Sequence, residues 1–284
     1  MLKINEDVVE QYDNVRRAIF DEAHGRSTRD SIARTVTQLE QYLERPLRVV
    51  VLGETNSGKT SLVNSIVGCG MLPTAVVDNT PVSVTVRHGQ RVGIRALSES
   101  QGWVDIGLDN PHEDMSALGR GSLRAVEICA PMALLERFEM VDTPGRGNPN
   151  QDVLGADVAV WCTHAAQAWS ESERRVWEGL PRRCRRNGIL AITHADVLDS
   201  PGDRAKVMQR LHAEAGEYFE DFVFVENSSD GEGCDGVLER LDSICTDYRA
   251  HRQRAVRRIA SRLDVKARVL GEQRQVEREH AFVA

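Results

Sequence analysis

The chain has 284 residues, of which 41% are hydrophobic, and its formal net charge is −7. This length allows one large domain or two small ones, and the apolar share is enough to fill a core. The negative charge argues against a protein whose whole surface binds nucleic acid, although it is compatible with a local basic patch. The sequence has no apolar run long enough for a membrane span, and its first residues are acidic where a signal peptide is apolar, so we expect a cytoplasmic protein.

The six cysteines are scattered, and no two of them form a C-x-x-C pair. This spacing indicates neither a zinc site nor a disulfide framework. We therefore expect reduced cysteines that act mostly as small core residues.

Both ends of the chain predict helices. Apolar residues recur at helical spacing through residues 4–43, with a break near Gly25, which predicts an amphipathic helical pair. Towards the C-terminus the same spacing runs into residues 246–284, which hold ten basic and five acidic side chains. A solvated helix face and a surface for an anionic partner are both compatible with that charge. We expect an N-terminal helical segment over 1–46, a nucleotide-binding domain over 47–233 and a basic helical segment over 234–284.

A glycine-rich motif behind a strand-like run predicts nucleotide binding. Residues 53–60 read G-E-T-N-S-G-K-T, which fits G-x-x-x-x-G-K-[ST], and the apolar residues 49–52 precede them. In this pattern backbone N–H groups and a helix N-terminus bind phosphate, the lysine reaches the β- and γ-phosphates, and the final hydroxyl completes a Mg²⁺ shell. The alternative, a glycine-rich surface turn, is disfavoured by the buried strand in front of it. We expect the nucleotide to contact Gly53, Asn56, Ser57, Gly58, Lys59, Thr60 and Ser61, with Mg²⁺ on Thr60.

A second phosphate signal ends a later strand. Residues 138–145 read as a strand that ends in D-T-P-G, and Asp142 begins that tetrapeptide. An aspartate at the carboxyl end of a strand beside the phosphate loop can hold Mg²⁺ through water, while the Gly145 N–H can sense a γ-phosphate. Alone the tetrapeptide is typical of an ordinary turn, and its place after the phosphate loop favours the functional interpretation.

The order of elements predicts the fold class. Further strands are expected over 81–87, 92–97, 123–130, 156–162, 188–192 and 222–225, and residues 170–173 read as a capping box that opens a helix. Residues 98–121 read as a surface insertion without an assigned role. Strands and helices that alternate with short connections predict an α/β protein with a doubly wound, mostly parallel sheet.

The sequence T-H-A-D at residues 193–196 predicts the base that is bound. A carboxylate at this strand end, Asp196, can accept hydrogen bonds from N1–H and the 2-amino group of guanine, a donor pair that adenine lacks. The alternative is that Asp196 only caps the following loop. We expect Thr193, His194 and Asp196 at the base.

Taken together, these ordered motifs resemble those of translation-factor-related GTPases and, more narrowly, of bacterial dynamin-like proteins. The narrower resemblance rests on the helix before the phosphate loop, on Leu72-Pro73-Thr74 followed by Thr80, and on residues 134–145. It covers about residues 43–241. It implies a P-loop GTPase fold with a short bundle formed by the terminal helices. It further implies that Mg²⁺ is held by Thr60, by Thr80 of switch I and, through water, by Asp142. Gly145 would belong to switch II, and Asn227 and Ser228 would contact the base.

Three positions depart from the family pattern. His194 stands where a lysine is usual, Asn227 where a serine is expected, and Arg146 where small signalling GTPases have a water-orienting glutamine. The resemblance implies that Asn56 instead supplies an oxygen to a monovalent cation such as K⁺, which neutralises charge in the transition state. The alternative is that Asn56 only hydrogen-bonds within its own loop. The expected catalytic residues are Asn56, Lys59, Thr80 and Gly145.

The predicted function is hydrolysis of GTP to GDP by a truncated dynamin-like GTPase. We expect it to pair through its nucleotide face as a homodimer or heterodimer and to lie peripherally on an anionic membrane, at the inner surface, with a partner. One alternative is an Era-like GTPase of ribosome assembly whose basic tail touches RNA phosphates, although nucleic acid is not the expected partner. The other is a nucleotide-binding scaffold with little turnover.

Overall fold

The structure is a computed structural model of the chain, and it describes residues 45–68, 82–118, 123–145, 153, 155–198, 200–226, 232–254 and 258. The chain divides into two compact units: one combines Met1–Arg45 with Cys245–Ala284, and the other runs over Pro46–Ile244. In the first unit, Arg252 donates a hydrogen bond to the carbonyl oxygen of Arg45 at 2.9 Å. The helices predicted over 4–43 and most of the basic tail lie outside the described residues.

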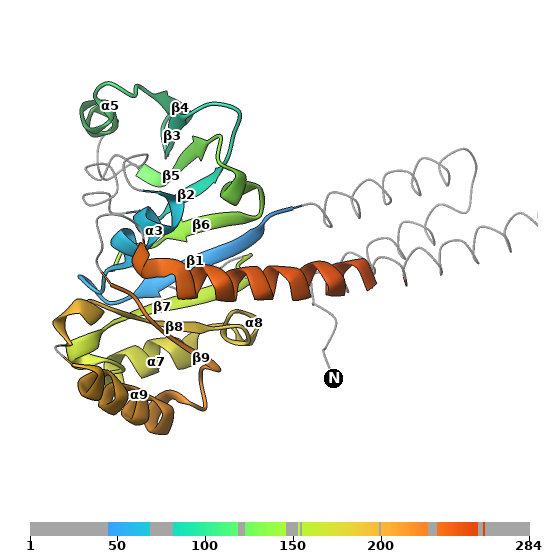
Figure 1. Ribbon diagram of the computed structural model, residues 1–284. Coiled ribbons are helices and arrows are strands. Elements are labelled where there is room, and N and C mark those ends of the chain that lie inside the picture. The colour runs from blue at the N-terminus through green and yellow to red at the C-terminus, as the bar shows by residue number, and fades with distance from the viewer. Residues whose placement is uncertain are drawn as a thin grey trace, which may run out of the picture. The chain divides into compact units, whose positions relative to one another are not determined.

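The second unit is built on a nine-stranded sheet with the order β4-β3-β5-β2-β6-β1-β7-β8-β9 (Figure 1). Five of its eight neighbouring pairs are parallel, and the antiparallel pairs are β2 with β6, β3 with β4 and β3 with β5. The predicted α/β class with a doubly wound, mostly parallel sheet is confirmed. The strands are β1 Leu47–Gly53, β2 Val84–His88, β3 Gly93–Ser98, β4 Gly102–Ile106, β5 Leu123–Ala130, β6 Phe138–Asp142, β7 Val158–His164, β8 Ile189–Thr193 and β9 Asp221–Phe224.

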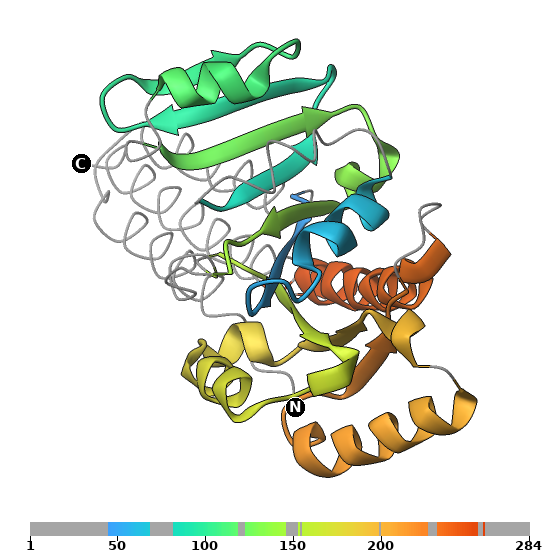
Figure 2. The same cartoon turned by 90° about the vertical axis from the view of Figure 1, so that its left-hand side faces the viewer.

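Helices cover both faces of the central strands. Figure 2 shows α3 on one side of the sheet and α7 on the other, and residues 235–244 of the helix that runs over 235–254 lie on the side of α3. The first turn of α7 is closed by the predicted capping box, in which the Glu173 N–H donates to Ser170 Oγ at 3.3 Å and the Ser170 N–H donates to Glu173 Oε2 at 2.7 Å. The helices are α3 Lys59–Val67, α5 Pro111–Ala117, α7 Glu171–Gly179, α8 Arg182–Arg185 and α9 Pro201–Ala215, and the 3₁₀ turns are η1 Ala133–Glu136, η2 Ala165–Gln167, η3 Ala195–Val197 and η4 Glu232–Cys234.

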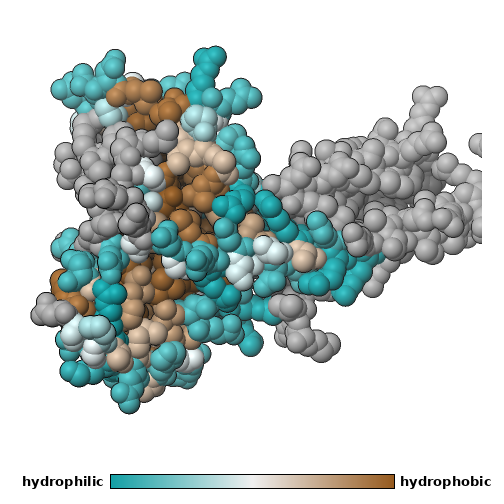
Figure 3. Space-filling view, in the orientation of Figure 1, coloured by the Kyte–Doolittle hydropathy of each residue, from teal (hydrophilic) through white to brown (hydrophobic). Residues whose placement is uncertain are grey.

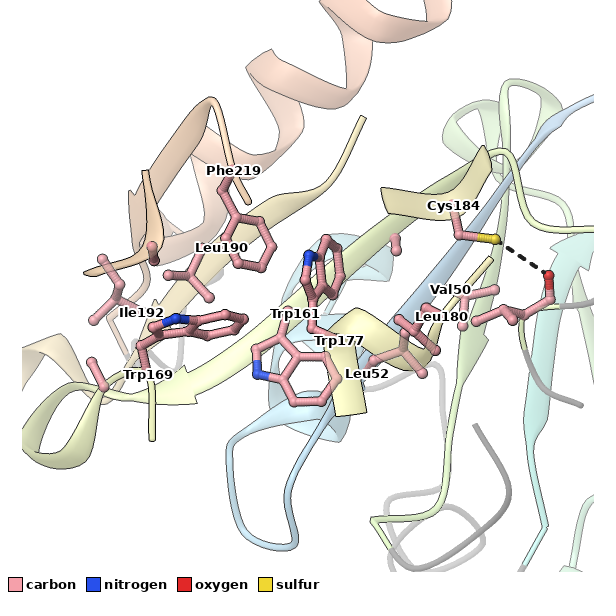
Figure 4. Close-up of a cluster of buried hydrophobic side chains, with 14 of the residues drawn as sticks. Val50, Leu52, Trp161, Trp169, Trp177, Leu180, Cys184, Leu190, Ile192 and Phe219 are labelled. Carbon is pink, nitrogen blue, oxygen red and sulfur yellow. Dashed lines mark hydrogen bonds between the residues drawn. The ribbon is translucent and has the colours of Figure 1, made fainter. Parts of the chain in front are cut away.

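The core lies along the parallel strands β1, β7 and β8, which are buried over nearly their whole length. Their unbroken apolar runs are typical of strands that are covered on both faces. Three tryptophans fill one side of this core (Figure 4), where Trp161 meets Trp169 and Trp177 edge to face with ring centroids 6.4 and 6.0 Å apart. The five described cysteines are free and four of them are buried, in agreement with their predicted role as reduced core residues.

The insertion over 98–121 has more structure than its sequence predicts. It contains the edge strand β4 and the short helix α5, so it extends the sheet by one strand. Gly102, with φ +73°, allows the tight turn between β3 and β4. Val92, Trp103 and Leu108 near this edge are 40%, 46% and 52% exposed, and Figure 3 shows hydrophobic surface where β4 and α5 lie.

Candidate nucleotide-binding site

The loop between β1 and α3 has the close backbone approaches that require glycine. A Cβ atom on Gly53 would lie 2.3 Å from the carbonyl oxygen of Cys162, and one on Gly58 would lie 3.1 Å from the Thr193 side chain. Gly58 has φ +80° and ends the loop directly before Lys59, the first residue of α3. The glycines of the motif are therefore fixed by β7 and β8, whose carboxyl ends lie against the loop.

Lys59 opens α3 with its ammonium group turned back over the loop. Its Nζ donates to the carbonyl oxygen of Glu54 at 2.6 Å, and the residue is only 6% exposed. Burial lowers the pKa of Lys59, while the neighbouring carboxylates of Asp142 and Glu54 act in the opposite direction. A bound phosphate would add negative charge beside this ammonium group and so favour its protonated form.

Two oxygen ligands suited to Mg²⁺ meet next to the loop. Thr60 Oγ1 donates to Asp142 Oδ2 at 2.6 Å, and Asp142 ends the buried strand β6. The next residue, Thr143, ties this strand end to β1 by donating to the carbonyl oxygen of Val51 at 2.8 Å. Hydroxyl and carboxylate oxygens are hard donors of the kind that Mg²⁺ prefers, so this pair fits such an ion.

The two phosphate motifs are in direct contact. A Cβ atom on Gly145 would lie 2.7 Å from Thr55 Cα and 2.9 Å from Thr55 N, so only glycine lets D-T-P-G approach the loop this closely. Ser57 Oγ is buried and has no hydrogen-bond partner among the described residues, which leaves polar capacity in the loop that the protein does not use. The predicted site residue Thr80 lies outside the described residues.

The loop is also tied to the T-H-A-D segment. Thr193 Oγ1 lies 2.8 Å from the carbonyl oxygen of Ser57 and 3.0 Å from that of Thr163. These contacts link the end of β8 to the phosphate loop and to β7. His194 follows in the left-handed conformation, with φ 55°, and Asp196 lies exposed in η3. Asn227 and Ser228 lie outside the described residues.

Asn56 is exposed and also has a left-handed backbone, with φ 63°. Asparagine adopts this conformation more readily than most residues. Within the described part of the chain, its side chain makes no hydrogen bond.

Sequence reasoning missed two groups at this end of the sheet. His164, the last residue of β7, stacks on His194 with ring centroids 4.4 Å apart. Ser172 in α7 donates to Glu54 Oε1 at 2.5 Å and so joins α7 to the loop. No sequence signal marks either contact, because each joins residues far apart in the chain.

A mostly parallel sheet with this loop after β1, and with an aspartate at the end of the adjacent β6, defines a P-loop nucleotide-binding domain. The sequence profile of the Dynamin family matches residues 49–211, more than half of the chain. The chain therefore belongs to the dynamin family and carries its GTPase domain, which confirms the resemblance seen in the sequence.

Individual relatives agree with this assignment. Dynamin-like protein 2 of Campylobacter jejuni (strain 81-176) is 26% identical over 172 residues, which cover 56% of this chain and 27% of the relative. An uncharacterised protein of Caldicellulosiruptor sp. (strain Rt8B.4) is 28% identical over 130 residues, which cover 43% of this chain and 32% of the relative. The chain thus spans about a third or less of these relatives.

Solved structures show the same fold. Two structures described as an oligomerised bacterial dynamin pair, with a mechanism for long-range sensing and tethering of membranes, superpose with TM-scores of 0.63 and 0.57. Their sequence identities are 14% and 18%, and the matches cover 100% and 90% of this chain but 59% and 43% of those chains.

Proposed function

We propose that the chain binds GTP with Mg²⁺, hydrolyses it to GDP, and works with a partner at an anionic membrane surface. The observation that carries the proposal is the convergence of the phosphate loop, Asp142 and the T-H-A-D segment at the carboxyl ends of β1, β6 and β8. In open α/β sheets this end of the strands is where ligands bind. Within this proposal 47–233 is the GTPase domain, and 1–46 and 234–284 are helical segments that flank it.

Each group has a task in phosphoryl transfer. The loop N–H groups and Lys59 would bind the β- and γ-phosphates, and Thr60 would give up its bond to Asp142 to bind the metal. Asp142 would then hold the Mg²⁺ ion through a water molecule. Mg²⁺, when bound, neutralises charge on the phosphate oxygens, while Thr80 and Gly145 would close over the γ-phosphate.

Guanine recognition by Asp196 gives the sharpest test. We expect GTP and GDP to bind in a titration with Mg²⁺, and ATP to bind far more weakly, because adenine lacks the two donors that Asp196 accepts. Asp196→Asn should shift the preference towards xanthine nucleotides. Glu99→Ala, a variant of an exposed residue in the turn after β3, should not. ATP binding within a few-fold of GTP would contradict the assignment.

The resemblance of the phosphate loop to those of dynamin-like and Era-like GTPases supports a cation role for Asn56, whose side chain is exposed in the loop. A K⁺ ion held by Asn56 would supply positive charge to stabilise the negative charge that develops in the transition state. Turnover should then be faster in KCl than in NaCl at equal ionic strength, and should rise with protein concentration if two nucleotide faces meet. Equal rates in both salts, with an unaffected Asn56→Ala variant, would exclude the cation.

Membrane association rests on the relatives and on charge. The solved dynamin pair is described as tethering membranes, and residues 246–284 of this chain carry the basic excess. Among the described helices, none has the length and apolarity needed to cross a bilayer. We expect salt-sensitive pelleting with anionic liposomes, with about 1 kcal/mol from each cationic side chain near the surface. Pelleting that persists after deletion of 249–284 would remove this role from the tail, and pelleting with ribosomes instead would favour an RNA partner.

A further inference from the structure

Two histidines at the carboxyl ends of adjacent strands, the second of them in the T-H-A-D segment, form a face-to-face pair. The ring centroids of His164 and His194 lie 4.4 Å apart with an interplanar angle of 20°. Both residues are half-buried. His194 belongs to the proposed base site, whereas no motif assigns a task to His164.

The backbone explains how the two rings meet. β7 and β8 are parallel neighbours in which His164 is paired with Thr193, so His194 lies one residue beyond that pair. Each histidine stands directly before a 3₁₀ turn, His164 before η2 and His194 before η3, and these turns contact each other. His164 has an extended backbone and His194 a left-handed one.

The orientation of the first ring is fixed by its own turn. His164 Nδ1 accepts a hydrogen bond from the Ala166 N–H at 3.2 Å. The backbone that carries His194 is fixed as well, because Thr193 is bonded to the phosphate loop at Ser57. Stacking against the His164 ring is therefore one of the contacts that set where the His194 ring lies relative to the phosphate site.

We propose that His164 is a positioning residue for nucleotide recognition: it holds the His194 ring flat beside Asp196, so that guanine stacks on the ring face turned away from His164. This inference rests on the proposed binding of guanine nucleotides. It gives the histidine pair the task that the stem of a single lysine would otherwise perform, which is to cover the base while Asp196 reads its edge. Aromatic faces stack on purine bases without a need for charge.

Three variants of His164 separate stacking from a purely structural role. His164→Ala removes the ring, His164→Asn keeps a short acceptor for the Ala166 N–H but no ring, and His164→Phe keeps a ring but no acceptor. If stacking matters, His164→Ala and His164→Asn should weaken GDP binding by roughly 3- to 10-fold, the range expected for an aromatic pair. His164→Phe should then retain most of the affinity. If only the hydrogen bond to the turn matters, His164→Asn should be the variant that retains the affinity for GDP.

A second background tests whether His164 acts through His194. The His194→Lys variant lacks the ring that His164 holds. Adding His164→Ala to this variant should therefore change GDP affinity by less than about 2-fold, so that the effects of the two substitutions are not additive. Inorganic pyrophosphate, which has no base, should bind equally well with and without His164. His212→Ala, which removes a histidine that contacts Phe222 away from the site, is the matched control.

The measurement is calorimetric titration of each full-length variant with GDP and with pyrophosphate, after thermal unfolding has shown that the variant is folded. Unchanged GDP affinity in His164→Ala, or an equal loss in the His194→Lys background, would overturn the positioning role while GTP binding stands. Parallel losses for GDP and pyrophosphate would also overturn it, as a general disturbance of the site. A wild-type chain that does not bind GDP would overturn the proposed function and this inference together.

Discussion

The central strands and the outer strands of the sheet are held together in different ways. β1, β7 and β8 are parallel and covered on both faces, and the phosphate loop, His164 and Thr193 lie at their carboxyl ends. β2, β3, β4 and β5 form a wing in which polar side chains interact across the middle of the strands. The central strands thus place the residues of the proposed nucleotide site at their carboxyl ends, whereas the polar residues of the wing hold neighbouring strands together.

Two buried glutamates show this difference most directly. In the centre, Glu173 is 4% exposed and accepts from neutral donors, Trp161 Nε1 at 3.0 Å and Thr163 Oγ1 at 3.2 Å. In the wing, Glu127 is 8% exposed, accepts two bonds of 3.0 Å from Arg95 and forms an ion pair with Arg87. The first carboxylate organises a buried polar network, and the second balances two half-exposed cations.

The largest expected effect separates the two regions by function. Lys59→Ala should lower GTP turnover by at least about 100-fold, because it removes the only cation that the phosphate loop itself contains. Trp103→Ala, in the wing, should leave turnover within about 2-fold of the wild-type chain. Phosphate release under saturating GTP measures both, and thermal unfolding confirms that both are folded. Comparable losses in the two variants would show that the wing takes part in catalysis.

The next effect concerns stability in the centre. Glu173→Ala should destabilise the fold by about 3 kcal/mol, because it leaves the donors of Trp161 and Thr163 buried without an acceptor and removes a helix cap. Urea unfolding gives this value from the shift in midpoint at constant slope. A loss below about 1 kcal/mol would mean that water satisfies those donors and that the network is not buried in solution.

The matching change in the wing should cost less. Glu127→Ala should destabilise the fold by about 1 kcal/mol, because the guanidinium groups of Arg87 and Arg95 are more than a third exposed and water can solvate them. Glu99→Ala, which breaks an ion pair exposed on both sides, is the control and should cost less than about 0.5 kcal/mol. If Glu127→Ala costs as much as Glu173→Ala, the contrast between the regions fails.

The same contrast explains what the sequence could predict. The apolar runs of β1, β6 and β8 and the motifs at their ends are local patterns, so the phosphate loop, D-T-P-G and T-H-A-D could be placed on strand ends without a structure. The strand β4 was not predicted, because only Val104 and Ile106 of its five residues are not freely exposed, and this alternation is too short to recognise. The His164–His194 pair and the salt bridges of Glu127 join distant residues, and no local pattern encodes such contacts.

The smallest expected effect tests whether the wing is held by specific side-chain pairs. The Arg95 guanidinium lies 4.6 Å from the centroid of the Trp103 ring, on an edge strand where the ring is 46% exposed. A cation over an exposed aromatic ring contributes about 0.5–1 kcal/mol. A double-mutant cycle of Arg95→Ala and Trp103→Leu should therefore give a coupling free energy of about 0.5 kcal/mol in urea unfolding.

The design of that cycle separates this pair from simple burial. Leucine keeps apolar contact with β3 but has no aromatic face, whereas Trp103→Phe keeps the face and should keep most of the coupling. Because Arg95 also binds Glu127, the cycle is repeated with Glu127→Ala in every member, so that the ion pair is absent throughout. Coupling that disappears in that background would show that Glu127 holds Arg95 over the ring, and the wing would then be one three-residue network rather than a set of independent pairs.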